Sequence, residues 1–142
     1  MNIPLLSRLQ ALAGKGTPAV DSKQAQRAEK TIQVIRQELP ELLAIAVIQI
    51  ESGQSLAAYS ALPALKPAKA AAHNAEVIKQ KRRAIAALKL ADERIDDILI
   101  SLTTQAHLLR VSQDGARLFY LVVDNKDTNL AIARAILQQH SS

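Results

Sequence analysis

The residues with the widest chemical range in this 142-residue sequence are its three histidines, because imidazole can act as acid, base or metal ligand near neutral pH. His73 falls in a predicted helix, His107 in a predicted strand and His140 close to the C-terminus. None has a second ligand at the spacing that metal sites use. The sequence also has no Cys, which excludes disulfides and thiolate metal sites. We therefore expect no metal centre.

Other catalytic patterns are missing as well. No Ser has the context of a nucleophile elbow, and no Gly-rich loop precedes a helix as a phosphate-binding loop would. An acidic cluster precedes a predicted strand and comprises Asp92, Glu93, Asp96 and Asp97. It can bind a cation, but it is more typical of a solvated loop that keeps the start of an edge strand from aggregating. We expect no catalytic residues and no cofactor, so the protein is predicted not to be an enzyme.

Basic residues are the remaining candidates for function. The net charge is +5, and a basic run extends over residues 79–83. Such a run is usually the solvated face of a helix, but it can also bind an acidic protein surface or, less readily, nucleic acid. Only three aromatic residues are present, which argues against a base-stacking platform. The predicted partner-binding residues are Lys79, Arg82 and Arg83.

Two apolar runs must lie at the centre of the fold. Residues 42–50 and 118–123 are almost continuously apolar, which is typical of strands buried on both faces. A shorter and weaker strand is predicted over residues 55–60, and further strands are predicted over residues 98–103 and 106–113. Ser52-Gly53 and Asp114-Gly115 supply hairpin turns, and Thr104-Gln105 is a further candidate turn.

Three helices complete the predicted domain. Residues 21–39 carry an apolar stripe, start at Asp21 and stop at Pro40. Residues 68–90 begin with a flat alanine surface that allows another backbone to approach closely. The last helix follows Asn129. Residues 1–20 are predicted to be an N-terminal extension, and residues 21–142 one domain, whose size is ordinary for a single core.

The short turns predict an α+β fold of the α/β-sandwich kind, with helices on both faces of a five-stranded antiparallel sheet. With the two buried strands side by side, the strand order is 2-1-5-4-3. The third strand, residues 98–103, then lies at an edge and is too apolar to remain bare. Self-association is expected there, through dimer-interface residues Ala71, Ala75, Ile78, Ile98, Leu99 and Ile100.

From about residue 22 to residue 140, the sequence resembles the Roadblock/dynein light chain family. The order of elements agrees, as do the Ser52-Gly53 turn, the Asp114-Gly115 turn, and the Asn129-Leu130 helix start followed by Ala133-Arg134. Members commonly have Gly after the Asn-Leu pair, where this chain has Ala131. The alanine-rich helix start and the N-terminal extension are also atypical.

The resemblance implies the profilin-like Roadblock fold and a homodimer or heterodimer joined through the third strand. It further implies a non-enzymatic regulator or scaffold that binds a small GTPase or a motor-type partner, as in bacterial members. A ligand-sensing module of similar fold and a nucleic-acid binder with a basic helix remain alternatives. No apolar run is long enough to cross a membrane, and residues 1–16 lack the pattern of a signal peptide, so a cytoplasmic location is expected.

Overall fold

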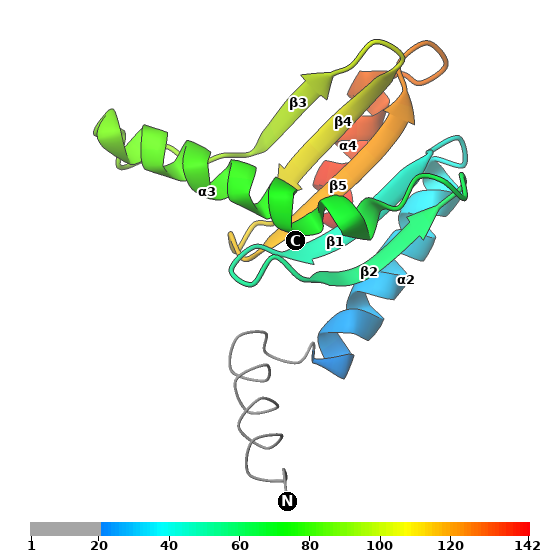
Figure 1. Ribbon diagram of the computed structural model, residues 1–142, viewed down its shortest axis with the longest axis horizontal. Coiled ribbons are helices and arrows are strands. Elements are labelled where there is room, and N and C mark those ends of the chain that lie inside the picture. Colours follow the sequence, from blue (N-terminus) through cyan, green and yellow to red (C-terminus); the bar gives the residue numbers. More distant parts are fainter. Residues whose placement is uncertain (1–20) are drawn as a thin grey trace, which may run out of the picture.

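The computed structural model describes residues 21–142, which fold as a five-stranded antiparallel sheet between helices (Figure 1). The strands are β1 (Ala44–Gln49), β2 (Ser55–Ser60), β3 (Asp97–Ser101), β4 (Gln105–Val111) and β5 (Arg117–Asp124). The helices are α2 (Ser22–Glu38), α3 (Ala71–Ala87), which follows the 3₁₀ turn η1 (Pro67–Ala70), and α4 (Leu130–His140). The predicted extension, residues 1–20, lies outside the described residues.

The strand order is β2-β1-β5-β4-β3, which confirms the predicted α+β fold and its sheet order 2-1-5-4-3. The two most apolar strands, β1 and β5, are central neighbours, with Ala46 paired to Tyr120 and Val47 to Phe119. Burial of both faces explains why these runs do not alternate with polar residues. The connection from β3 to β4 differs from the prediction, because Gln105 already belongs to β4 and pairs with Asp124.

The sheet carries one core on each face. Helices α2 and α4 cover one face, and α3 crosses the other (Figure 1). The first core includes Ile32 and Ile35 of α2 with Phe119 of β5. The second includes Ala75 and Ile78 of α3 with residues of β1, β4 and β5. Asp21 caps α2 by accepting a hydrogen bond from the Lys23 N–H, and Asn129 caps α4 by accepting one from the Ile132 N–H.

The small residues at the start of α3 allow it to lie close to its own sheet. A Cβ atom placed on Gly53, in the β1–β2 turn, would come within 3.2 Å of the Ala72 Cα atom. Gly53 also has a positive φ of 74°. The flat alanine surface therefore supports a close approach within the chain. No helix among residues 21–142 is both long and apolar enough to cross a membrane.

Candidate functional site: the β3 edge and helix α3

Strand β3 forms one open edge of the sheet, since β4 is its only neighbour among the strands of residues 21–142. The Leu102 N–H donates to the Gln105 carbonyl at 2.8 Å, and the Val111 N–H donates to the Asp96 carbonyl at 3.0 Å. Hydrogen-bonded and non-bonded pairs alternate along an antiparallel ladder. The backbone groups of Ile98 and Ile100 therefore point toward β4. Those of the odd-numbered residues in β3 point outward, where no strand of the described part of the chain meets them: Asp97, Leu99 and Ser101.

The side chains of β3 make this edge apolar on both faces. Ile98 and Ile100 pack at the margin of the core under α3. Leu99 projects to the opposite face and remains 39% exposed. The strand carries no Lys or Pro to discourage pairing with another strand.

Asp97 anchors the start of β3 to the helix behind the sheet. Arg134 of α4 donates two hydrogen bonds to its carboxylate, from Nε to Oδ2 at 3.0 Å and from Nη2 to Oδ1 at 2.7 Å. Nη1 of Arg110 lies 3.6 Å from Oδ2, and the Asp97 side chain is only 8% exposed. The hydrogen bond and charge of Asp97 raise the pKa of Arg134. The prediction of a solvated acidic loop is thus wrong for Asp97, which belongs to the strand and is ion-paired.

Helix α3 extends beyond the sheet at this edge. Its first half crosses the strands, whereas its second half projects past β3 (Figure 1). Between the helix and the strand is an open groove of about 730 Å³, bordered by Val77, Lys81, Ala84 and Ile98 among others. Val77 is 39% exposed and Leu88 is 66% exposed, so apolar surface continues along the projecting half.

The six residues predicted for a dimer interface divide into two groups. Three of them are buried in the core of their own protomer, with exposed fractions of 2% for Ala71, 1% for Ala75 and 0% for Ile78. These three residues pack on their own sheet and leave little surface for a second copy, and their place in a dimer interface stays a prediction. The three β3 residues keep accessible surface or outward backbone groups: Ile98, Leu99 and Ile100.

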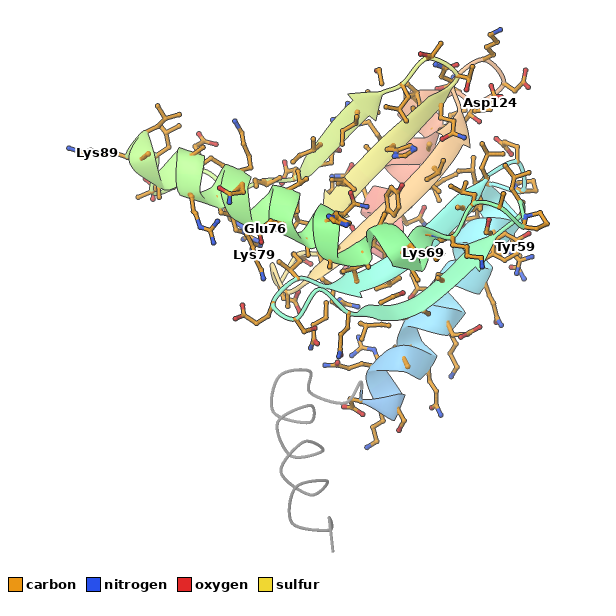
Figure 2. All side chains as sticks on the ribbon, in the orientation of Figure 1. Tyr59, Lys69, Glu76, Lys79, Lys89 and Asp124 are labelled. Carbon is orange, nitrogen blue, oxygen red and sulfur yellow. The ribbon has the colours of Figure 1, made fainter. Side chains whose placement is uncertain are left out.

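The predicted partner-binding residues also separate. Nζ of Lys79 donates to the Glu51 carbonyl at 2.9 Å, and Nη2 of Arg82 donates to the Gly115 carbonyl at 2.7 Å. Both side chains therefore tie α3 to hairpin turns at one end of the sheet, and Figure 2 labels Lys79 on this side of the helix. Both hydrogen bonds go to neutral backbone carbonyls and not to carboxylates. Arg83 instead pairs with Glu76 at 3.3 Å on an exposed part of α3.

Hydrogen bonds to Gln80 and Arg83 lower the pKa of Glu76. The exposed pair of Glu76 with Arg83 is of a kind that contributes little to stability. Arg83 and the groove residue Lys81 are thus the basic side chains of α3 that face solvent beside the β3 edge without holding a turn.

The three histidines lie in separate environments. His73 is exposed on α3 beside the groove. His107 lies between the Gln105 amide oxygen, 3.1 Å from Nε2, and the Tyr120 hydroxyl, 3.0 Å from Nδ1. His140 Nε2 lies 2.7 Å from Glu38 Oε2. Within residues 21–142, no group of three or more His, Asp or Glu side chains is placed to hold a metal ion.

Burial shifts the pKa values of His107 and of its neighbour Tyr120. It lowers the pKa of His107, because a charged imidazolium loses hydration there, and it raises the pKa of the Tyr120 hydroxyl. Sequence reasoning missed this pair, as well as the Asp97–Arg134 contact. Only the β4–β5 register brings His107 and Tyr120 together.

Comparison with known proteins finds structural relatives only. No protein-family model matches the sequence, and no curated protein matches it. Among solved structures, Myxococcus xanthus MglB aligns with a TM-score of 0.66 at 13% identity, over 82% of this chain and 84% of that chain. A Roadblock/LC7 domain from Streptomyces avermitilis aligns with a TM-score of 0.63 at 11% identity, over 77% and 87%.

A third solved structure, described as MglB with a tetrameric arrangement, has a TM-score of 0.61 and 21% identity, over 82% of this chain and 85% of that chain. These identities are low, so the likeness concerns the fold. It agrees with the fold that the resemblance carried by the Ser52-Gly53, Asp114-Gly115 and Asn129-Leu130 motifs implies. The resemblance seen in the sequence is thereby confirmed at the level of the fold, and the chain is a Roadblock-fold protein.

Proposed function

We propose that this chain is a dimeric, non-enzymatic regulatory or scaffold protein that binds a small GTPase. The observation that carries the proposal is the open β3 edge, whose outward backbone groups lie next to an apolar groove under α3. An exposed apolar edge of this kind is a template for pairing with another strand. The likeness to MglB and to a Roadblock/LC7 domain supports a role of the regulatory class.

The dimer that we propose joins two β3 strands in antiparallel register. The outward-facing residues are odd-numbered, so a two-fold axis can pass beside Leu99 and pair it with Leu99 of the second copy. Asp97 would then lie opposite Ser101 of that copy. In this register the two Leu99 side chains meet on one face, and Ile98 meets Ile100 on the other. The Leu99 pair would cover surface that is 39% exposed in the protomer, and the Ile98–Ile100 pairs would cover side chains that are partly buried there.

The partner surface of this dimer would include the solvent-facing cations of α3. We call the proposed line of contact between the two β3 strands the β3 seam. Lys81 and Arg83 from each chain would flank this seam and attract an acidic surface of the partner. Charges at the rim of an interface mainly change association rate and salt dependence. Lys79 and Arg82 serve the fold through Glu51 and Gly115, so we assign them a smaller share of the partner surface than the sequence predicted. A cytoplasmic location belongs to the same proposal.

The ligand-sensing alternative receives less support. The groove beside β3 is open along its length and is not an enclosed cavity, whereas small-molecule sites bury most of the ligand surface. Its position against an open strand edge better suits another polypeptide.

Capture from an extract of the source cell, with and without a GTP analogue, tests the GTPase proposal. We expect the full-length protein to retain a small GTPase, identified by mass spectrometry, in a nucleotide-dependent manner. The interaction should be reproduced with the two purified proteins. A double variant, Lys81→Glu with Arg83→Glu, should bind more slowly while its dimer remains intact.

The matched control is the double variant Lys23→Glu with Lys30→Glu, which reverses two exposed lysines of α2 on the face of the sheet opposite α3. It should bind the GTPase at the normal rate. Capture of the same amount of GTPase with and without the GTP analogue would contradict the proposal. So would equal association rates for the α3 and α2 variants. GTP hydrolysis by the protein alone would also contradict it.

A further inference from the structure

The second open edge of the sheet, at β2, lies at the opposite side of the sheet from β3, and no strand within residues 21–142 pairs with it there. The Ala61 N–H donates to the Leu43 carbonyl at 2.8 Å, and Ala57 and Tyr59 lie opposite Val47 and Ile45 of β1. By the alternation of an antiparallel ladder, the backbone groups of Ala58 and Ser60 point away from β1. In the part of the chain that the structure describes, no other backbone group hydrogen-bonds to them.

This edge lacks the usual devices that prevent strand addition. The sequence of β2, Ser-Leu-Ala-Ala-Tyr-Ser, contains no Lys, no Pro and no charged residue. Natural edge strands are commonly blocked by such residues. A bulge between the pairs Val47–Ala57 and Ile48–Ser55 disturbs only the beginning of the strand. The second half of β2 is therefore free to accept a further strand.

A groove runs beside this half of the strand, between β2 and α2. It measures about 370 Å³ and is lined by Gln33, Arg36, Gln37, Pro40, Leu42 and Tyr59. Tyr59 is labelled at the outer margin of the sheet in Figure 2. A residue of an added strand next to Tyr59, with its side chain on the α2 face, would project into this groove.

Arg36 supplies the charge that selects the occupant. Its guanidinium carbon lies 3.4 Å from the centre of the Tyr59 ring, a stacked cation–π arrangement that orients the guanidinium plane. Within residues 21–142, no carboxylate lies within 4.0 Å of its nitrogens. Residues 1–20 contain no Asp or Glu. The oriented cation therefore lacks an anionic side chain from its own protomer.

We propose that the β2 edge and this groove bind an extended acidic segment of another protein as a sixth strand. Backbone groups of Ala58 and Ser60 would pair with the segment, and its Asp or Glu next to Tyr59 would accept hydrogen bonds from Arg36. The Gln33 and Gln37 amides can contact neighbouring polar atoms. Strand addition provides affinity through the main chain and specificity through alternate side chains. This site is separate from the proposed GTPase surface and from the β3 seam.

Selection from a displayed library of random linear heptapeptides tests the proposal, with the full-length protein as bait. Enriched peptides should share one Asp or Glu, with β-branched or apolar residues two positions away. Replacing that acidic residue with its amide should weaken binding about tenfold, as expected for loss of one charge-assisted contact. Arg36→Gln should weaken binding by a similar factor, and the two changes together should add little, because both remove the same contact.

Ala58→Pro should abolish peptide binding, since it removes an outward N–H while keeping the bonds to β1. Lys30→Gln, at another exposed position of α2, should bind the peptides normally. Circular dichroism and light scattering should show unchanged fold and assembly for every variant. The proposal is wrong if no peptide is enriched, if the acidic residue is absent, or if Ala58→Pro binds equally well. It is also wrong if Ala58→Pro only lowers the order of self-assembly, which would make a second copy the occupant.

Discussion

Arg134 of α4 holds Asp97 of β3 by two hydrogen bonds, at 3.0 and 2.7 Å, across the α4 face of the sheet. The contact joins residues 37 positions apart and reaches β3, which pairs with β4 on one side and has no strand of residues 21–142 on the other. An edge strand held by one neighbour gains order from such a side-chain anchor. The start of β3 is therefore presented in a defined position.

Arg134→Met should loosen β3 and weaken the proposed dimer while the rest of the domain stays folded. Light scattering over a dilution series should show dissociation at higher protein concentration, and hydrogen exchange should become faster in β3 amides. Arg83→Met is the matched control, because it also removes an arginine–carboxylate pair but does not touch β3. Equal dissociation of the two variants would contradict an anchoring role for Arg134.

Proline substitutions at adjacent positions of β3 should have different effects. Leu99→Pro removes an outward N–H and should abolish dimerisation with little change in the fold of the monomer. Ile98→Pro removes an N–H that faces β4 and should lower the free energy of unfolding by about 1–3 kcal/mol, the cost of leaving a buried acceptor unpaired. Light scattering and chemical denaturation separate the two effects. A Leu99→Pro protein that still forms dimers would exclude β3 as the seam.

Acid should destabilise the protein through His107. Burial lowers its pKa below the usual value, so the unfolded state takes up a proton at higher pH than the folded state does. The folded state is then fully favoured above the unfolded pKa of about 6.5, and the contribution of His107 is lost as pH falls toward its folded pKa. Because the Gln105 amide oxygen beside Nε2 can only accept, the neutral ring carries its proton on Nε2 and Nδ1 accepts from the Tyr120 hydroxyl, so protonation of His107 removes that acceptor.

Denaturation between pH 7 and pH 5 should therefore show a decline in stability that His107→Gln reduces. His73→Gln, at an exposed position of α3, provides the control and should retain the full decline. A His107→Gln protein with the same pH dependence as the unchanged protein would rule out this origin.

The two glycine turns offer a comparison of backbone strain with steric contact. Gly53 and Gly115 have positive φ values of 74° and 77°, so Ala at either position should cost about 1–2 kcal/mol. At Gly53 the new Cβ would also meet the Ala72 Cα atom at 3.2 Å, whereas at Gly115 it would meet only the end of the Arg82 side chain at 3.5 Å. Gly53→Ala should therefore be the more destabilising in thermal and chemical denaturation. An equal loss of unfolding free energy in the two variants would mean that α3 moves away from the new Cβ atom without any loss of stability.

Local pattern was enough to predict most of the fold. The continuous apolar runs that include β1 and β5 required central positions, and the Asp114-Gly115 turn joined β4 to β5, so the strand order followed. The boundaries were less accurate, since Gln105 was assigned to a turn and the first residues of the long helix form the 3₁₀ turn η1. Turn chemistry at Thr104-Gln105 is weak, and tertiary packing decides where the strand resumes.

The candidate site was predicted only in part, because its contacts join distant segments. The alanine stripe of α3 indicated a close approach, but sequence could not distinguish the chain's own Gly53 turn from a second copy. Lys79 and Arg82 reach carbonyl groups 28 and 33 residues away, and no local pattern reveals such acceptors. Asp97 resembled its acidic neighbours until the strand placed it opposite Arg134.

The projecting half of α3 has a consequence for measurement. The helix is tied to the sheet through Ile78, Lys79 and Arg82, whereas residues 83–87 are exposed except for the half-buried Ile85, and Figure 1 shows the end of α3 projecting past β3. A helix end with few tertiary contacts frays readily in water. Amide protection should therefore fall along α3 in an isolated protomer and become even when the end is covered. Hydrogen exchange at the isotope-labelled amide of Ala87 would thus report the fraction of protomers whose α3 end is covered by a second copy or a partner.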